Sequence, residues 1–119
     1  VKELMTDIEL EDYSRSVSKS RVHPALRREH ILAVAVNLAR KEGYGNITRA
    51  GIAESAGISE ALVSHYFGPM DSMREQIMTE AVQQGIVEIV AIGLGTGDPI
   101  ARGATPEVKR AAVELMMND

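Results

Sequence analysis

Lysines and arginines are the residues of this sequence whose type and spacing could do chemistry. Residues 13–49 hold eight of them against two glutamates, which gives this segment a net charge of +6. The flanking segments are acidic, with −4 over residues 1–12 and −6 over residues 50–119, so the total is −4. Clustered cations neutralise phosphates and release condensed counterions. The charge pattern therefore indicates a nucleic acid, and a solvated basic arm without a partner stays open as the alternative.

Residue types suited to catalysis or metal binding are sparse. The chain has no cysteine, and its three histidines are scattered along the sequence. This composition excludes a disulfide, a thiolate nucleophile and a zinc site built on sulfur. Because the sequence offers no nucleophile with a base and no carboxylate pair in a defined pocket, we expect no catalytic residue, no metal, no cofactor and no enzyme.

Length and hydropathy limit the architecture. With 119 residues, 45% of them hydrophobic and 3% aromatic, the chain can build one modest aliphatic core. Its longest uncharged stretch is far shorter than the roughly 20 apolar residues of a membrane span. We therefore expect a cytoplasmic protein with no membrane contact. The glycines of residues 93–97 do not make a phosphate-binding loop, because a helical pattern precedes them and Pro99 follows them.

Capping residues and apolar spacing predict three helices in the first part of the folded region. Pro24 can begin the first helix, and Gly43 can end it with a left-handed backbone. Thr48 can cap a second helix and Ser59 a third, with only residues 57–59 between the two. Two short helices joined by a tight turn that contains glycine form a helix-turn-helix pattern.

The second half of the sequence predicts two further helices. Pro69 can begin a long fourth helix whose apolar face continues to Val90, and Thr105 can cap a fifth. A glycine-rich link over residues 93–103 would join them. The β-branched residues between 85 and 94 leave a strand open as an alternative, but a single strand would have no partner in this chain.

Residues 28–73 resemble the N-terminal DNA-binding domain of the TetR family of transcriptional repressors. The resemblance is carried by Arg28, Ile31, Leu32, Gly43, Tyr44, Thr48, Ile52, Ala53, the turn Ala56-Gly57-Ile58-Ser59, His65, Tyr66, Phe67 and Met73. It implies an all-α fold in which a three-helix helix-turn-helix headpiece is followed by one or two dimerisation helices. The expected organisation is a mobile N-terminal arm over residues 1–22, a DNA-binding domain over 23–68 and a short helical dimerisation region over 69–119.

The resemblance also implies which residues bind DNA. Helix 59–66 would be the recognition helix in the major groove, with Leu62 touching a thymine methyl group and Ser64 a base edge. Thr48 and Arg49 would hold a phosphate, and the arm would reach the minor groove. Val63 and Phe67 would be core. The complete expected set is Arg15, Lys19, Arg21, Arg27, Arg28, Thr48, Arg49, Ser59, Glu60, Ala61, Leu62, Ser64, His65 and Tyr66.

Three positions depart from the usual pattern of the family. Ser64 stands where an aromatic phosphate ligand is usual, and Met70 stands where lysine is usual. Glu60 places an acid near the groove, which is tolerable where it accepts from a cytosine amino group. We expect the basic segment to compensate for these losses through Arg15, Lys19, Arg21, Arg27 and Arg28.

The expected function is that of an unusually short TetR-type repressor without the usual ligand-binding domain. It would bind double-stranded DNA as a homodimer on a near-palindromic operator, and no small-molecule ligand is expected. The alternative is a protein-interaction module, an adaptor or antirepressor, that keeps the headpiece but has lost DNA binding. The expected dimer interface consists of Ile77, Ala81, Ile89, Leu115 and Met116.

Overall fold

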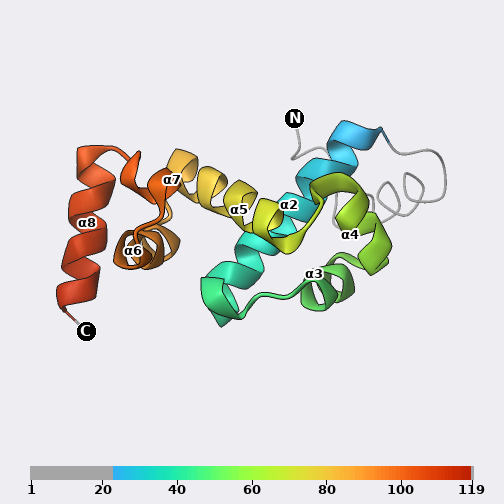
Figure 1. Cartoon of the computed structure of the whole chain (residues 1–119), viewed down its shortest axis with the longest axis horizontal. Helices are drawn as coiled ribbons and strands as arrows, with labels where there is room; N and C mark the ends of the chain where they lie inside the picture. Colours follow the sequence, from blue (N-terminus) through green and yellow to red (C-terminus); the bar gives the residue numbers. More distant parts are fainter. Residues whose placement is uncertain (1–22, 119) are drawn as a thin grey trace, which may run out of the picture.

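The computed structural model describes residues 23–118, and these residues form helices without any β-strand. Figure 1 shows the helix-turn-helix part at one end of the molecule and the last helix at the other. The elements are α2 (Pro24–Glu42), η2 (Tyr44–Asn46), α3 (Arg49–Ala56), α4 (Glu60–Phe67), α5 (Met70–Gln84), α6 (Val87–Thr96), α7 (Pro99–Arg102) and α8 (Pro106–Met117). The predicted all-α fold is confirmed.

Local hydrogen bonds explain where α2, α3 and α4 begin. His23 lies one residue before the start of α2. Its Nδ1 accepts from the backbone N–H of Ala25 at 3.1 Å. Thr48 caps α3 by accepting from the N–H of Gly51 at 3.0 Å. Ser59 caps α4 in the same way, from the N–H of Leu62 at 3.1 Å. These caps satisfy backbone donors that the first turn of a helix leaves unpaired. The predicted helix-turn-helix is therefore present, and residues next to each helix define where the helix begins.

The long fourth helix expected after Pro69 is wrong, because the chain breaks it at Gly85. This glycine has a left-handed backbone with φ of 70°, and the N–H of Ile86 returns to the carbonyl of Ala81 at 2.9 Å. Such a pairing closes a helix end. A new helix, α6, then begins at Val87. The alternative of a strand between residues 85 and 94 is also excluded.

The glycine-rich link expected over residues 93–103 is largely helical. Gly93 and Gly95 lie inside α6, which ends at Gly97 with φ of 78°. Asp98 then caps the short helix α7, where its Oδ1 accepts from the N–H of Ile100 at 2.8 Å. Gly93 is buried where α6 meets α7, so its lack of a side chain permits this close packing. The predicted fifth helix is present as α8.

The apolar core runs through both ends of the molecule, and α5 belongs to both. At one end α2, α3 and α4 bury Ile31, Ile52 and Val63. At the other end α6 packs against α5, α7 and α8 around Ile89 and Ala112. None of the helices within residues 23–118 has the length and apolar character needed to cross a membrane.

This packing corrects the expected dimer interface. The side chains of Ile77, Ala81 and Ile89 are 0% exposed, because α5 and α6 bury them against their own neighbours. They are therefore inaccessible to a second chain. Leu115 and Met116, on α8, are 41% and 42% exposed. Only these two residues of the expected interface remain available.

Candidate nucleic-acid interface

Helix α4 has one buried side and one accessible side. Val63 and Phe67 are 1% and 5% exposed, as expected for core residues. The accessible side of the helix and its cap is made of exposed Ser59, Glu60, Ala61 and His65 and of partly buried Leu62, Ser64 and Tyr66. The residues predicted for the recognition helix therefore lie on the part of α4 that the core leaves uncovered or only partly covered.

Arg28 holds α4 in place instead of facing solvent with the other predicted DNA ligands. Its guanidinium carbon lies 4.6 Å from the centre of the Phe67 ring, and its Nη2 donates to Oε1 of Gln76 at 2.9 Å. These contacts join α2, α4 and α5 through one side chain. One N–H of its guanidinium is therefore engaged within the chain, and the expectation that Arg28 binds DNA stays a prediction.

Thr48 and Arg49 lie at the start of α3. The hydroxyl oxygen of Thr48 is used for the cap, and the Arg49 side chain is partly buried. Within the part of the chain that the structure describes, the buried Nε of Arg49 has no hydrogen-bond partner. An unpaired buried donor is unfavourable, so this atom is a local cost of the way the Arg49 side chain packs.

Three side chains with rings make contacts at two places in the headpiece. The rings of His65 and Tyr66 meet edge to face, with 5.0 Å between their centres. The hydroxyl of Tyr44 donates to the carbonyl of Arg74 at 3.1 Å and so fastens the turn after α2 to α5. Burial raises the pKa of this hydroxyl, and the carboxylate of Asp98 raises it further. The Tyr44 proton is thus retained for this hydrogen bond.

A cleft beside α4 brings in His30, a residue that the sequence analysis missed. The cleft has a volume of about 300 Å³ and is lined by Arg27, His30, Ala56, Gly57, Ile58, Ser59 and Leu62. Arg27 and His30 are three residues apart, so they share a face of α2. This spacing was the available signal in the sequence, but only the packing of α2 against the turn made it a cleft.

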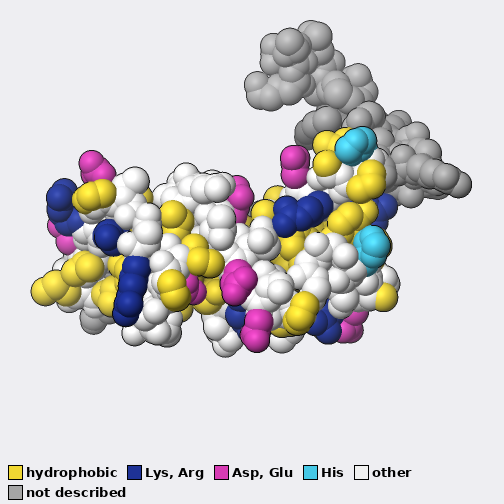
Figure 2. Space-filling model, turned by 45° about the horizontal axis from the view of Figure 1, so that its top comes forward, with side chains coloured by type: hydrophobic (Ala, Val, Ile, Leu, Met, Phe, Trp, Pro, Cys, Tyr) yellow, Lys and Arg dark blue, Asp and Glu magenta, His cyan; other side chains and the backbone are white. Residues whose placement is uncertain are grey.

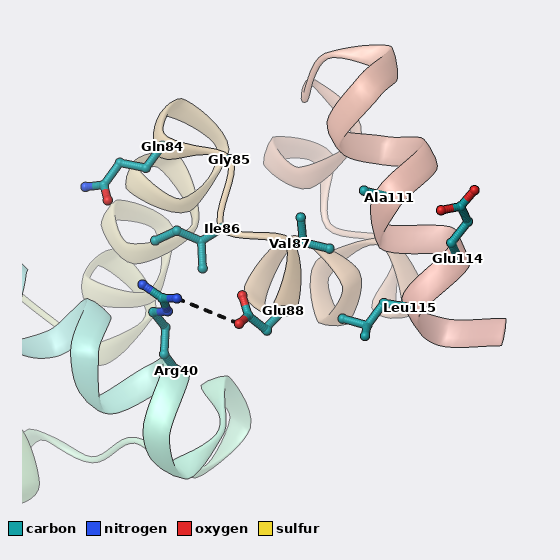
Figure 3. A pocket seen from close by; sticks show the side chains of 9 residues that line it. All are labelled: Arg40, Gln84, Gly85, Ile86, Val87, Glu88, Ala111, Glu114 and Leu115. Carbon is teal, nitrogen blue, oxygen red and sulfur yellow. Dashed lines mark ion pairs between the residues drawn. The ribbon is translucent and has the colours of Figure 1, made fainter. Parts of the chain in front are cut away.

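The basic segment of the sequence is not one surface in space. Arg27 and Arg49 belong to the part of the headpiece around α4, whereas Arg40 lies near the other end of α2. There its Nη2 is 3.8 Å from Oε2 of Glu88 on α6, an ion pair drawn in Figure 3. Arg15, Lys19 and Arg21, which were also expected to bind DNA, lie outside the described residues. The positive charge beside α4 that comes from the described residues is therefore smaller than the +6 net charge of the segment.

A groove separates this ion pair from α8. Its volume is about 570 Å³, and Figure 3 shows Arg40 and Glu88 on one side and Ala111, Glu114 and Leu115 of α8 on the other. Arg40 and Glu88 have half-exposed side chains, at 50% and 55%. The groove is thus open and polar in part, unlike the enclosed apolar sites that bind most small molecules.

Comparison with known proteins shows which family the helix-turn-helix part of the chain resembles. Residues 31–77 match the model of the bacterial regulatory proteins of the tetR family, and this segment contains the whole helix-turn-helix. Over these residues the chain is similar to the tetR family of bacterial regulatory proteins. Met70, which replaces the lysine usual in this family, is partly buried and packs against the core, so it supports the start of α5 from inside.

The curated relatives that the chain matches are named as transcriptional regulators of the helix-turn-helix type. The chain is 31% identical over 88 residues to the HTH-type transcriptional regulator BetI of Brucella anthropi, a match that covers 74% of this chain and 42% of the relative. It is 32% identical over 66 residues to BetI of Stenotrophomonas maltophilia and 27% identical over 66 residues to the HTH-type transcriptional regulator LuxR of Vibrio harveyi. The latter two matches each cover 56% of this chain, and 33% and 32% of the respective relatives. No solved structure matches the chain.

Proposed function

We propose that this chain is a sequence-specific DNA-binding transcriptional repressor that acts as a homodimer on a near-palindromic operator. The observation that carries the proposal concerns the two parts of α4. Val63 and Phe67 are buried in the core, whereas Glu60, Ala61 and His65 are exposed. A short helix of this kind enters the major groove with its N-terminal residues toward the base edges. The names of the relatives support the same class of function.

The two parts of this surface have different tasks on DNA. Glu60, Ala61 and Ser64 contact base edges, and base contacts carry sequence information. Thr48 and Arg49 lie at the positive end of α3 and bind a phosphate. Phosphate contacts fix the orientation of the protein and do not distinguish between bases.

Substitutions in these two parts are expected to have different effects. Glu60→Ala and Ser64→Ala should change the preferred bases, with a loss of about 1–3 kcal/mol of discrimination for each lost contact. Arg49→Ala should weaken the binding of all sequences alike. Selection of bound fragments from random DNA measures the preference, and a gel shift measures the affinity. An unchanged consensus with Glu60→Ala, together with a changed one with Arg49→Ala, would contradict this orientation of α4.

The basic test of the proposal is a salt-dependent shift of labelled duplex DNA by the whole chain. Binding should weaken steeply as salt is raised, because phosphate contacts release counterions. The absence of any shift at low salt would overturn the proposal. It would favour the other candidate class, a protein-interaction module that keeps the headpiece without binding DNA.

The homodimer is proposed from the apolar side chains that α8 leaves exposed. Val113, Leu115, Met116 and Met117 are 44%, 41%, 42% and 79% exposed. Figure 2 shows apolar side chains among charged ones at the end of the molecule where α8 lies. Apolar groups gathered on one helix favour association with a second copy. Two copies related by a two-fold axis would read two half-sites, which a single short recognition helix cannot do.

The Met116→Lys variant should shift the chain from dimer to monomer at micromolar concentration, because it places a charge among these apolar side chains. Sedimentation at several concentrations measures the change, and we expect the dimer to weaken by at least about tenfold. Glu107→Lys is the matched control, since it puts the same side chain on an exposed position in the first turn of α8. Equal weakening by both variants, or a wild-type monomer with full affinity for one half-site, would contradict the dimer.

The proposal includes regulation by protein abundance instead of a small-molecule inducer. The groove between α2, α6 and α8 is the relevant surface, and its half-exposed ion pair makes it a poor enclosure for an apolar ligand. A small molecule that copurifies in this groove would contradict this part of the proposal. Since the target is DNA, the proposed location is the cytoplasm.

A further inference from the structure

We infer that Arg27 and His30 together hold one phosphate of the DNA backbone in the cleft beside α4. The inference rests on the proposed function and adds His30 as a DNA-binding residue. Both side chains lie on one face of α2 and line the cleft of about 300 Å³, whose opposite wall is the turn before α4 and its first residues. The cleft therefore lies beside the residues proposed to read the bases.

The charge of the cleft suits a phosphate. Arg27 is a permanent cation, and His30 can donate a hydrogen bond from a ring nitrogen in either protonation state. Among the described residues that line the cleft, none carries a carboxylate. The nearest acid in sequence, Glu29, instead lines a separate depression with Glu80 and Gln84 on α5. The cationic groups of the cleft are thus not neutralised by this acid.

The apolar part of the cleft suits the sugar that carries the phosphate. Ala56, Ile58 and Leu62 supply carbon surface beside the two basic side chains. A free inorganic anion would leave this surface unused, whereas a nucleotide of a DNA strand presents a phosphate and the carbon atoms of deoxyribose together. This combination favours a strand that passes along the major groove over a small dissolved ion.

Arg28, although it is the next residue, does not line this cleft. Its guanidinium is held by the Phe67 ring and by Gln76. The two neighbouring arginines therefore differ in function, since Arg28 positions α4 from inside and Arg27 faces the cleft. A sequence-based assignment treats both as equivalent members of a basic segment.

The test uses ethylation interference, in which ethylated phosphates of a bound duplex reveal where neutralisation of one phosphate charge weakens binding. The duplex is one selected from random DNA by the wild-type chain. The variants are Arg27→Ala and His30→Ala, and alanine keeps the helix because it has the highest helix propensity. Lys41→Ala is the matched control, because Lys41 is an exposed cation near the other end of the same helix.

We expect Arg27→Ala to lower affinity about tenfold and to reduce the slope of log affinity against log salt by about 0.9. His30→Ala should lower affinity about fivefold. In both variants ethylation of one particular phosphate should lose its effect, while all other interfering phosphates stay the same. Lys41→Ala should leave the interference pattern and the affinity unchanged, and thermal melting should confirm that all three variants fold.

The possible failures are distinguishable. If both variants keep every interfering phosphate of the wild type, the cleft holds no phosphate, although the chain still binds DNA. If Lys41→Ala reduces affinity as much as Arg27→Ala does, the effect is one of overall charge and the inference is wrong. If inorganic phosphate binds the cleft as tightly as duplex DNA does, the ligand of the cleft is a small anion and the inference is wrong. If the wild-type chain binds no duplex, the proposed function fails and this inference with it.

Discussion

Gly93→Ala should destabilise the fold, by about 1–3 kcal/mol in the free energy of unfolding. A Cβ atom at this position would lie 2.6 Å from Cβ of Ala101 and 2.7 Å from Cε of Met78. The methionine end can move, but Ala101 is fixed on α7, so α6 and α7 must separate. Urea unfolding monitored by circular dichroism measures the change.

Gly95→Ala is the matched control in the same helix. A Cβ atom there would lie 3.7 Å from Cε of Met116, an ordinary contact. Because alanine favours a helix over glycine, this variant should gain up to about 1 kcal/mol. The two substitutions are chemically identical and should have opposite signs. Equal stabilisation by both would show that α7 does not pack on Gly93 as described.

Removal of three cations before α2 should have the largest effect on DNA affinity. In the variant with Arg15, Lys19 and Arg21 all changed to alanine, we expect the slope of log affinity against log salt to fall by roughly 2 to 3 units. The reason is that each cation that contacts a phosphate contributes about 0.9 to the slope. Gel shifts over a range of salt concentrations measure it.

The control for this variant replaces other basic residues of the chain. Lys41, Arg102 and Arg110 are exposed cations outside the headpiece surface around α4, and their triple alanine variant changes the net charge by the same amount. Its slope should remain close to that of the wild type. An unchanged slope in the Arg15, Lys19 and Arg21 variant would remove these three residues from the interface.

Helix ends and the helix-turn-helix could be predicted because they depend on neighbouring residues. Thr48 and Ser59 each satisfy a backbone donor only three residues away, so the spacing of these residues is sufficient evidence. The break at Gly85 is also local, but a glycine inside an apolar pattern is equally compatible with a continuous helix. That pattern favoured one long helix, and the left-handed backbone at Gly85 ended it.

The sequence by itself determined the helical class, the caps of α3, α4 and α8, the two core positions Val63 and Phe67 and the family resemblance. Only the tertiary structure decided which side chains remain accessible. Arg28 makes contacts within the chain because Phe67 and Gln76 reach it from two other helices. Ile77 and Ile89 are not available for a dimer interface, because α5 and α6 bury them within the chain. Periodicity shows that a helix has an apolar face, but it does not show which surface will cover that face, since the covering residues are distant in sequence.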